Sequence, residues 1–494
     1  MLVRDGQAPA TGAWVARLVV IGGGAAGMSA ASAARRAAPS LDVVVCEAGG
    51  FAAYGMCGIP YYLGGVVPEA EDLLAYPPSE FRDKRGIDLR LHSWVSAINP
   101  AAHQVRVHQM RAPSPPSGPP SGPPSGADGG GLLGYDMLIA ATGAVPVRPP
   151  VPGLEGPRVF TIRSLDEAIG LRRLLDSGAI RHAIVIGAGY IGLEAAEALA
   201  EAGAEVEVIE ALPRVLGTVD EPIARVVQTE LERHTTVRLG ARLDEVRGGG
   251  SELTAVVGDT EIRTDLVVVG AGVRPATDLL IRAGAEHLPD QSVRVDASMR
   301  TSLPDVFAAG DCAALHHLVL DGPAWVPLGP AANKTGRVAG TVAGGGSASF
   351  GGIVGTAVVK VFGLEVARTG LTLAEAQAAG LAAAAVDVVS RSRAKYYPGG
   401  QPLHVRLVHA PDGRLLGGQL AGREGAAKRI DVLATALHAG MGVADIAGLD
   451  LSYAPPFAPV YDPVLAAAIK ASGHLASRPR AESEGHDEPA AAPR

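Results

Sequence analysis

Two stretches of the chain show the same succession of apolar and glycine-rich segments. The first has an apolar run over residues 18–21, a glycine turn, an alanine-rich stretch over 25–38 and a second apolar run over 43–46. Short apolar runs bounded by glycines predict buried strands, and the alanine-rich stretch predicts a helix. The second stretch repeats this order, with runs over residues 183–186 and 206–210 and a helix between them that ends near residue 202. The sequence therefore predicts two βαβ units.

Each unit carries three glycines at its strand–helix turn and an acidic residue after its second strand. The residues are Gly22, Gly24, Gly27 and Glu47 in the first unit, and Gly187, Gly189, Gly192 and Glu210 in the second. Such glycines permit a tight turn and let a pyrophosphate approach the helix N-terminus, while the acid, about 20 residues on, can bind a ribose diol. Each unit is predicted to bind a dinucleotide. The acid also favours an unphosphorylated ribose, so Glu210 favours NADH over NADPH, although Arg214 could weaken that preference.

The remainder of the chain extends this pattern. Apolar segments over 135–143 and 264–272 follow the two units, and a third over 301–312 ends in Gly310-Asp311. Asp311 could place a carboxylate on a polyol chain, or could simply end a strand. The Pro/Ser/Gly repeat within 112–131 predicts a flexible insert. From about Gly351 the pattern indicates a further domain without a glycine fingerprint.

Composition narrows the class of protein. The chain has 494 residues, of which 47% are hydrophobic and 19% charged, so it can build a large core. A net charge of −8 argues against nucleic acid as a partner. No apolar run is long enough to predict a membrane span, and the start lacks the pattern of a secretory signal. With only three cysteines, we expect a reducing cytoplasm.

One of the three cysteines has distinctive surroundings. Cys57 is flanked by glycines, and Pro60 suits the first turn of a helix, so Cys57 is expected at a helix N-terminus with a lowered pKa. Cys46 and Cys312 are expected to be buried and inert. Because no second cysteine stands near Cys57, its redox partner must be an external sulfur. This predicts a mixed disulfide with a small thiol from outside the chain.

Several motifs together resemble a known family, over about residues 17–470. They are IGGGAAGMSAA, YGMCGIPYYLGG, IAATGA, GAGYIGLEAAE, GAGVRP, VFAAGDC, KYYPGG and LSYAPPF. The chain resembles FAD-dependent pyridine nucleotide-disulfide oxidoreductases of the single-cysteine branch, most closely the coenzyme A-disulfide reductases. The resemblance implies an α/β fold with two doubly wound, Rossmann-like nucleotide-binding domains and a C-terminal α+β dimerisation domain. It also implies that NADH or NADPH reduces a small disulfide by way of FAD and Cys57.

The resemblance further implies domain boundaries and site residues. The FAD-binding domain would comprise residues 16–150 and 275–348, the NAD(P)-binding domain 151–274 and the dimerisation domain 349–470, with disordered ends at 1–15 and 471–494. For FAD it marks Gly22, Gly24, Ala25, Gly27, Glu47, Thr142, Gly143 and Asp311. For the nicotinamide dinucleotide it marks Gly187, Gly189, Tyr190, Ile191, Gly192, Glu210 and Gly272, with Tyr190 covering the flavin until nicotinamide displaces it. For coenzyme A it marks Arg36, Lys84, Arg85 and Asn333, of which the three basic residues could equally be solvated surface groups.

Catalysis is assigned by the resemblance to Cys57, Tyr396 and Tyr453. The two tyrosines would reach the partner subunit's cysteine in a homodimer and protonate a leaving thiolate, unless they serve only interface packing. Three alternatives remain: a persulfide or polysulfide reductase, an NADH oxidase or peroxidase, and a flavin redox sensor or electron-transfer subunit. The oxidase alternative is weakened because Ala25 replaces a typical histidine, and because a Ser-Phe lead-in to the cysteine is missing. Three cysteines cannot build the iron–sulfur cluster that would support an electron-transfer role.

Overall fold

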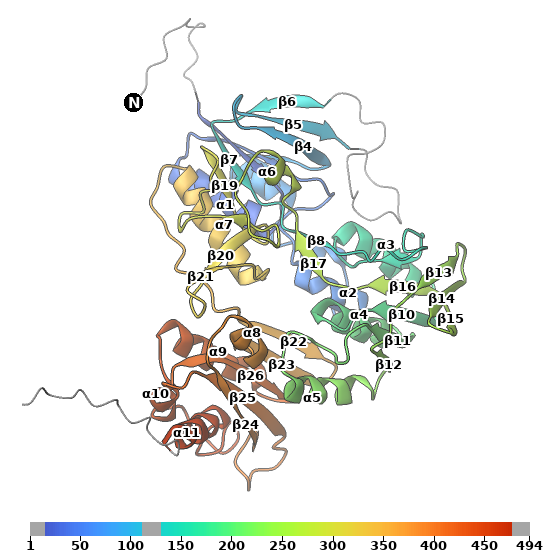
Figure 1. Ribbon diagram of the computed structural model, residues 1–494. Coiled ribbons are helices and arrows are strands. Elements are labelled where there is room, and N and C mark those ends of the chain that lie inside the picture. Colours follow the sequence, from blue (N-terminus) through green and yellow to red (C-terminus); the bar gives the residue numbers. More distant parts are fainter. Residues whose placement is uncertain (1–14, 111–129, 477–494) are drawn as a thin grey trace, which may run out of the picture. The chain divides into compact units, whose positions relative to one another are not determined.

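The computed structural model describes residues 15–110 and 130–476 of the chain (Figure 1). The described residues form two compact units, unit 1 up to Gly363 and unit 2 from Leu364. None of the helices in the described ranges is long and apolar enough to cross a membrane.

Unit 1 contains two five-stranded parallel sheets, as the two βαβ patterns predict. The first sheet has the order β19 (Val306–Ala308), β7 (Met137–Ala140), β1 (Arg17–Ile21), β2 (Asp42–Cys46) and β3 (Ile87–Arg90). The second has the order β12 (Thr236–Leu239), β11 (Glu205–Glu210), β10 (His182–Ile186), β16 (Leu266–Val269) and β9 (Val159–Phe160). Helices α1 (Ala25–Ala37) and α4 (Tyr190–Glu201) form the two predicted crossovers. This confirms the doubly wound α/β fold class.

Each parallel sheet of unit 1 is accompanied by a three-stranded antiparallel sheet. The strands are β4 (Ser93–Asn99), β5 (Gln104–Gln109) and β6 (Gly131–Gly134) in one, and β13 (Glu245–Gly248), β14 (Leu253–Val257) and β15 (Thr260–Thr264) in the other. Further helices of the unit are α2 (Ile59–Leu63), α3 (Leu165–Asp176), α5 (Glu221–Leu231), α6 (Asp278–Arg282) and α7 (Gly329–Ala343).

Helices α1 and α7 lie unusually close together. A Cβ atom added at Gly336 would stand 2.2 Å from the carbonyl oxygen of Ala26, and one at Gly340 would stand 2.0 Å from that of Ala30. Only glycine therefore fits at these two positions of α7. The close approach fixes α1, whose N-terminus forms the first glycine-rich turn.

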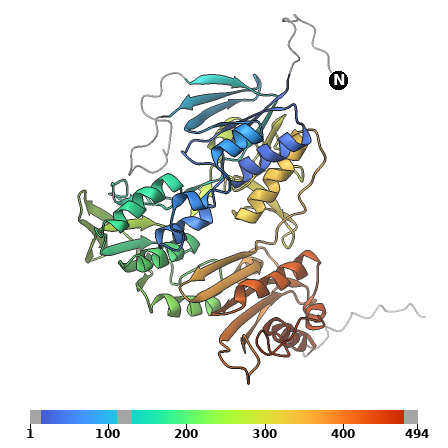
Figure 2. The ribbon, with the colours of Figure 1, turned by 180° about the vertical axis from the view of Figure 1, so that it is seen from behind.

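Unit 2 is an antiparallel sheet covered by helices (Figure 2). Strands β23 (Leu364–Gly370), β26 (Leu415–Gly422), β25 (Pro402–His409) and β24 (Ala384–Arg391) pair in that order. Helix α9 (Ala426–His438) packs on β23 and β26, and α11 (Pro463–Ala476) packs on β24 and β25. Two shorter helices, α8 (Leu373–Ala378) and α10 (Val443–Ala447), complete the α+β unit.

Two boundary expectations need correction. A disordered tail was expected from residue 471, but residues 471–476 belong to α11. Ala468 and Ala471 of this helix are buried against the sheet. The flexible insert was expected to end at residue 131, but Gly131 already pairs with Val107 in the antiparallel sheet. The expectations for residues 1–14, 112–129 and 477–494 lie outside the described residues.

Candidate functional site

The first glycine-rich turn has the geometry that a dinucleotide requires. Gly22 has a φ of +101°, and a Cβ there would lie 2.3 Å from the carbonyl oxygen of Ala141. A Cβ at Gly27 would lie 1.9 Å from the carbonyl oxygen of Gly22, so helix and strand can pack only if both residues are glycines. Gly24 is the N-cap of α1 and Ala25 its first residue. No side chain caps this helix, so its first backbone N–H groups remain available to phosphate oxygens.

Glu47 directly follows β2, and its carboxylate binds the backbone of the first glycine-rich turn. Its Oε2 accepts a hydrogen bond of 2.6 Å from the backbone N–H of Gly23, and its Oε1 accepts one of 2.7 Å from Gly49. Surrounding protein atoms exclude water from the carboxylate, and this desolvation raises its pKa against the effect of the two N–H groups. A diol that donates hydrogen bonds would compensate for the lost water.

The second turn repeats this arrangement. A Cβ at Gly187 (φ +94°) would lie 2.6 Å from the carbonyl oxygen of Gly270, and one at Gly192 would lie 1.9 Å from that of Gly187. Glu210 accepts hydrogen bonds of 2.6 Å from Ala188 N–H and 2.8 Å from Leu212 N–H.

Other residues expected at the second site surround this turn. Gly189 is the N-cap of α4, whose first residues are Tyr190 and Ile191, and Gly272 adopts a φ of +99° shortly after β16. Arg214 is half-buried, and its Nε has no hydrogen-bond partner within the described part of the chain. The second sheet therefore presents a cradle of the same form as the first.

The remaining residues expected at FAD gather at the carboxyl edge of the first sheet. Strands β7 and β19 are neighbours there, and they lead into Gly143 (φ +71°) and Gly310 (φ +78°) respectively. The Oγ1 of Thr142 donates a 2.6 Å hydrogen bond to the carbonyl oxygen of Ala276. Asp311 follows Gly310, and burial raises the pKa of its carboxyl group, an effect that the charge of Arg163 opposes. The carboxyl edge of a doubly wound sheet is where nucleotides bind.

Cys57 lies in a single 3-10 turn, η1 (Met56–Gly58), directly before α2. Pro60 occupies the first turn of α2, as expected, and the thiol is free and exposed. The expectation of a lowered pKa is wrong for the protein described here. Partial burial and the negative charges of Glu194 and Asp311 raise the pKa of Cys57, and α2, with five residues, is too short to offset them.

The other two cysteines are buried, as the sequence indicates. Cys46 is 1% exposed within β2, where burial raises its pKa to about 11, and Cys312 is 0% exposed. Cys57 is therefore the one accessible thiol among the three cysteines of the chain.

Sequence reasoning missed two charged groups near Cys57. Glu194 lies on α4, one turn after Tyr190, and burial together with the charge of Glu197 raises its pKa to about 7. Arg163, directly before α3, donates hydrogen bonds to Sδ of Met56 and, over 2.9 Å, to the carbonyl oxygen of Ala144. The only signal for Glu194 in the sequence is its helical spacing from Tyr190, and we found none for Arg163.

The residues expected at coenzyme A lie along and beside α1. Asn333, on α7, accepts a 2.8 Å hydrogen bond from Ser29 of α1, and Arg85 donates one of 3.3 Å to Ser32. Arg36 is exposed on the last turn of α1. Lys84 pairs with Glu80 over 2.7 Å, and Arg85 also lies over the Tyr76 ring, 4.3 Å from its centroid.

The two expected tyrosines form a pair in unit 2. The hydroxyls of Tyr396 and Tyr453 are 3.1 Å apart, and the side chains are 75% and 45% exposed. The hydrogen bond to Tyr396 raises the pKa of Tyr453. Phe457 and Tyr461, also in unit 2, are 76% and 66% exposed.

Comparison with known proteins places the chain in a family. A model of the pyridine nucleotide-disulphide oxidoreductases matches residues 16–336, and a model of their dimerisation domain matches residues 356–463. The chain belongs to the pyridine nucleotide-disulphide oxidoreductase family. It is therefore an FAD-dependent enzyme that uses NAD(P)H, and its C-terminal unit is a dimerisation domain.

Several similar proteins are named for related reductase activities. The chain is 35% identical, over 92% of its length and 98% of the relative's, to an NAD(P)H sulfur oxidoreductase (CoA-dependent) of Pyrococcus abyssi. It is 29% identical, over 89% of its length and 96% of the relative's, to a coenzyme A disulfide reductase of Staphylococcus aureus. The structure of an NAD-dependent persulfide reductase from A. fulgidus superposes with a TM-score of 0.86 at 36% identity, covering 93% of this chain and 84% of that one.

The first cradle fits the FAD that the family requires. Gly22 and Gly27 permit the tight turn and the close packing of α1 on β1, and α1 leaves its first N–H groups uncapped. Glu47 and Asp311 supply two desolvated carboxylates, which suit the hydroxyl groups of a ribose and a ribityl chain. No cluster of residues that could hold a metal ion occurs within the described ranges.

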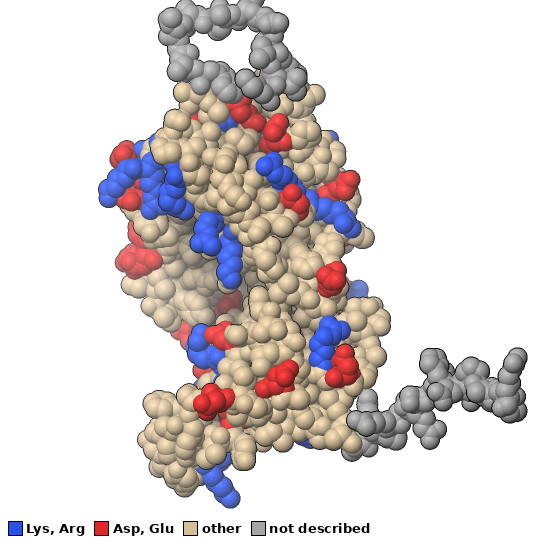
Figure 3. Space-filling model, turned by 90° about the vertical axis from the view of Figure 1, so that its left-hand side faces the viewer, with Lys and Arg blue, Asp and Glu red and all other residues tan. Residues whose placement is uncertain are grey.

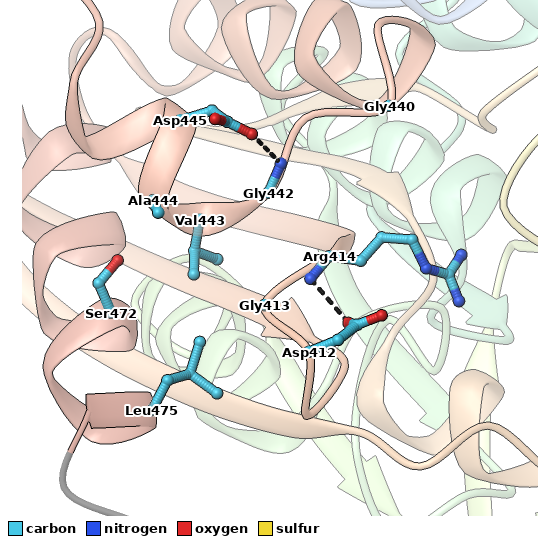
Figure 4. Close-up of a pocket in the computed structure, with 10 residues that line it drawn as sticks. All are labelled: Asp412, Gly413, Arg414, Gly440, Gly442, Val443, Ala444, Asp445, Ser472 and Leu475. Atoms are coloured by element: carbon cyan, nitrogen blue, oxygen red, sulfur yellow. Dashed lines mark hydrogen bonds between the residues drawn. The ribbon is translucent and has the colours of Figure 1, made fainter.

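Two surface hollows of unit 2 contain none of these residues. The hollow in Figure 4 has a volume of about 420 Å³, and its carboxylates already accept hydrogen bonds from neighbouring backbone N–H groups. Asp445 accepts from Gly442 N–H at 2.8 Å, and Asp412 accepts from Arg414 N–H at 3.0 Å (Figure 4). On the face shown in Figure 3, basic and acidic side chains are interspersed, as the weak net charge suggests. Neither these hollows nor the distribution of charge on this face suggests a second ligand.

Proposed function

We propose that this enzyme uses NAD(P)H to reduce coenzyme A disulfide, with Cys57 forming a mixed disulfide with one half of the substrate. One observation carries the proposal: Cys57 is the accessible thiol of the chain, and both other cysteines are buried. A two-cysteine redox pair therefore cannot form within the polypeptide. The second sulfur of the catalytic disulfide has to come from the substrate.

The reaction balances with one two-electron donor. The Cys57 thiolate attacks one sulfur of the substrate disulfide, the S–S bond breaks, and the departing thiolate takes up a proton. FAD supplies the two electrons, which originate in NAD(P)H, for reduction of the resulting mixed disulfide. The second thiol then leaves and Cys57 returns as a thiolate. Each turnover thus consumes one NAD(P)H, one proton and one disulfide, and releases two thiols.

A row of polar groups beside α1 supports an extended, phosphate-bearing substrate. Ser29, Ser32 and Arg36 recur at helical spacing on this helix, and Asn333 and Arg85 join the row from neighbouring segments. From Ser29 to Arg36 the row is about 10 Å long. Phosphate oxygens of coenzyme A would compete with Glu80 for Lys84 and Arg85.

The tyrosine pair supports action as a homodimer. The hydroxyl groups of Tyr396 and Tyr453 lie at hydrogen-bond distance, and both side chains are exposed on the dimerisation domain. We assign them to protonation of the thiolate that leaves at the partner subunit's Cys57. Glu210 supports NADH as the preferred donor, because its carboxylate would repel the 2′-phosphate of NADPH.

Coenzyme A persulfide is the second candidate substrate. The relatives that are 35% identical are named for CoA-dependent sulfur reduction, and the A. fulgidus protein is named a persulfide reductase. Attack of Cys57 on the coenzyme A sulfur of a persulfide would give the same mixed disulfide and release sulfide instead of a first thiol. Both candidates therefore share the role of Cys57.

Anaerobic product analysis tests the proposal and separates the candidates. Purified enzyme is given NADH with either coenzyme A disulfide or coenzyme A persulfide, and thiol, sulfide and NADH are counted. The proposal expects two thiols per NADH from the disulfide, with turnover lost in Cys57→Ser while FAD stays bound. Cys46→Ala, which alters a buried cysteine, is the matched control and should keep turnover. Undiminished disulfide reduction by Cys57→Ser would refute the proposal, whereas turnover with the persulfide alone would favour the second candidate.

A further inference from the structure

Arg163 lies where three segments of unit 1 meet. Its Nη1 donates to Sδ of Met56, the residue before Cys57, and its Nε donates to the carbonyl oxygen of Ala144. Its Nη2 lies 3.3 Å from the position that a Cβ would take at Gly143. The guanidinium group therefore stands between the loop at the carboxyl end of β7 and the turn that carries Cys57.

The backbone that holds Arg163 is strained. Ile162 has a φ of +53°, a conformation that a β-branched residue rarely adopts, and its side chain is 7% exposed. The carboxylate of Glu167, itself 4% exposed, accepts hydrogen bonds from Thr161 N–H at 2.6 Å and from Arg163 N–H at 2.9 Å. A buried carboxylate thus braces both sides of the strained residue. Strain of this kind persists where surrounding contacts over-determine it, and it clusters at functional sites.

Several charged groups near Cys57 affect the stability of its thiolate. The carboxylates of Glu194 on α4 and Asp311 after β19 raise the pKa of Cys57, and Arg163 acts in the opposite direction. The charge of Glu194 also raises the pKa of Tyr61, which lies on α2 four residues after Cys57 and interacts with the Cys57 charge. Lys360 pairs with Glu197, so its charge is already balanced. Within the described part of the chain, a backbone hydrogen bond at Cys57 and the charge of Arg163 oppose the effect of the two carboxylates on the pKa of Cys57.

We propose that Arg163 is a positioning residue whose guanidinium group holds the Met56–Cys57 turn and stabilises the Cys57 thiolate against the carboxylates of Glu194 and Asp311. The proposal rests on the proposed function of Cys57 and deepens it. The thiol gives its proton to water, and the guanidinium group, which stays protonated in proteins, takes no part in the proton transfer. Without the cation, the thiolate would form only at higher pH.

Alkylation of Cys57 by iodoacetamide tests this without any disulfide substrate. The thiolate displaces iodide and keeps the carbamidomethyl group, so the pH profile of the rate reports its ionisation. FAD-loaded protein is first reduced with dithiothreitol and desalted under anaerobic conditions, and modified Cys57 is quantified by peptide mass. We expect Arg163→Met to raise the midpoint of the profile by about one pH unit, which lowers the fraction of thiolate at pH 7 by roughly tenfold. Arg163→Lys, which keeps the charge, should recover part of the shift.

The controls separate an electrostatic role from a structural one. Arg172→Gln removes another guanidinium group, one that donates to the Tyr62 carbonyl oxygen at 2.7 Å from α3, and should leave the midpoint unchanged. At a pH above both midpoints, the Arg163→Met variant should react at least as fast as the unaltered enzyme, because a thiolate of higher pKa is the stronger nucleophile, whereas a merely disturbed turn would not restore the rate. If Arg163→Met does not fold, Arg163→Gln is measured instead and must show the same shift.

An unchanged midpoint in the FAD-loaded Arg163→Met or Arg163→Gln variant would overturn the inference while leaving the role of Cys57 intact. A failure of Cys57 to react at any pH in the unaltered enzyme would instead remove the proposed function. The two outcomes are thus distinguishable within one experiment.

Discussion

Glu194→Gln should change the pH dependence of stability in a defined direction. Burial and the charge of Glu197 raise the pKa of Glu194 from its ordinary value of 4.5 to about 7. Because the folded state then binds the proton more tightly than the unfolded state, the enzyme loses stability as pH rises from about 4.5 to about 7 and loses no more beyond it. Glutamine has the same shape and no charge, so the variant lacks this loss.

The size of the effect follows from the shift. About 2.5 pKa units at ~1.4 kcal/mol each correspond to roughly 3.5 kcal/mol as an upper value. The free energy of unfolding of the variant, relative to that of the unaltered enzyme, should therefore be about 2 kcal/mol higher at pH 8 than at pH 5. Differential scanning calorimetry at both pH values, with the same excess of FAD in every sample, measures this gain, because bound cofactor also stabilises the folded state.

A surface control makes the result specific. Glu252→Gln changes an exposed glutamate of the same unit and should show no such gain. If Glu194→Gln and the unaltered enzyme keep the same difference in Tm at pH 5 and pH 8, the carboxyl group does not titrate near neutrality, and the reasoning about α4 fails.

Three further predictions follow from the geometry. Gly336→Ala should lower the free energy of unfolding by more than about 2 kcal/mol in thermal or urea denaturation, because its Cβ would stand 2.2 Å from the Ala26 carbonyl oxygen; an unchanged midpoint would contradict the close packing of α1 and α7. Glu210→Gln should narrow the preference for NADH over NADPH by about tenfold in kcat/KM, and an unaltered ratio would show that the carboxylate does not meet the ribose. Tyr453→Phe should slow the thiol half-reaction and spare flavin reduction in stopped-flow absorbance, whereas equal slowing of both would indicate a packing role for the pair with Tyr396.

The regular parts of the fold were predictable because they depend on local pattern. The strand, turn and helix around Gly22 and those around Gly187 lie within a few residues of their predicted bounds, since glycine spacing and apolar runs encode them directly. The exposure of Cys57 and the burial of Cys46 were predictable for the same reason.

The electrostatics of the site were not predictable, because they depend on groups that approach through space. Glu194 and Asp311 reach Cys57 from distant parts of the chain, and their charges reverse the pKa shift expected from the short helix α2. The position of Arg163 depends on a positive φ at Ile162, which no sequence rule for a β-branched residue would suggest.

In the proposed function, Cys57 shares its redox cycle with a sulfur of the substrate. The most direct test is the mass of the protein after anaerobic incubation of the dithiothreitol-reduced, desalted enzyme with coenzyme A disulfide, followed by denaturation without reductant. We expect one coenzyme A per chain, attached at Cys57, and its disappearance when NADH is added before denaturation. A chain without an adduct, or an adduct at Cys57 that NADH does not remove, would contradict the proposed role of Cys57.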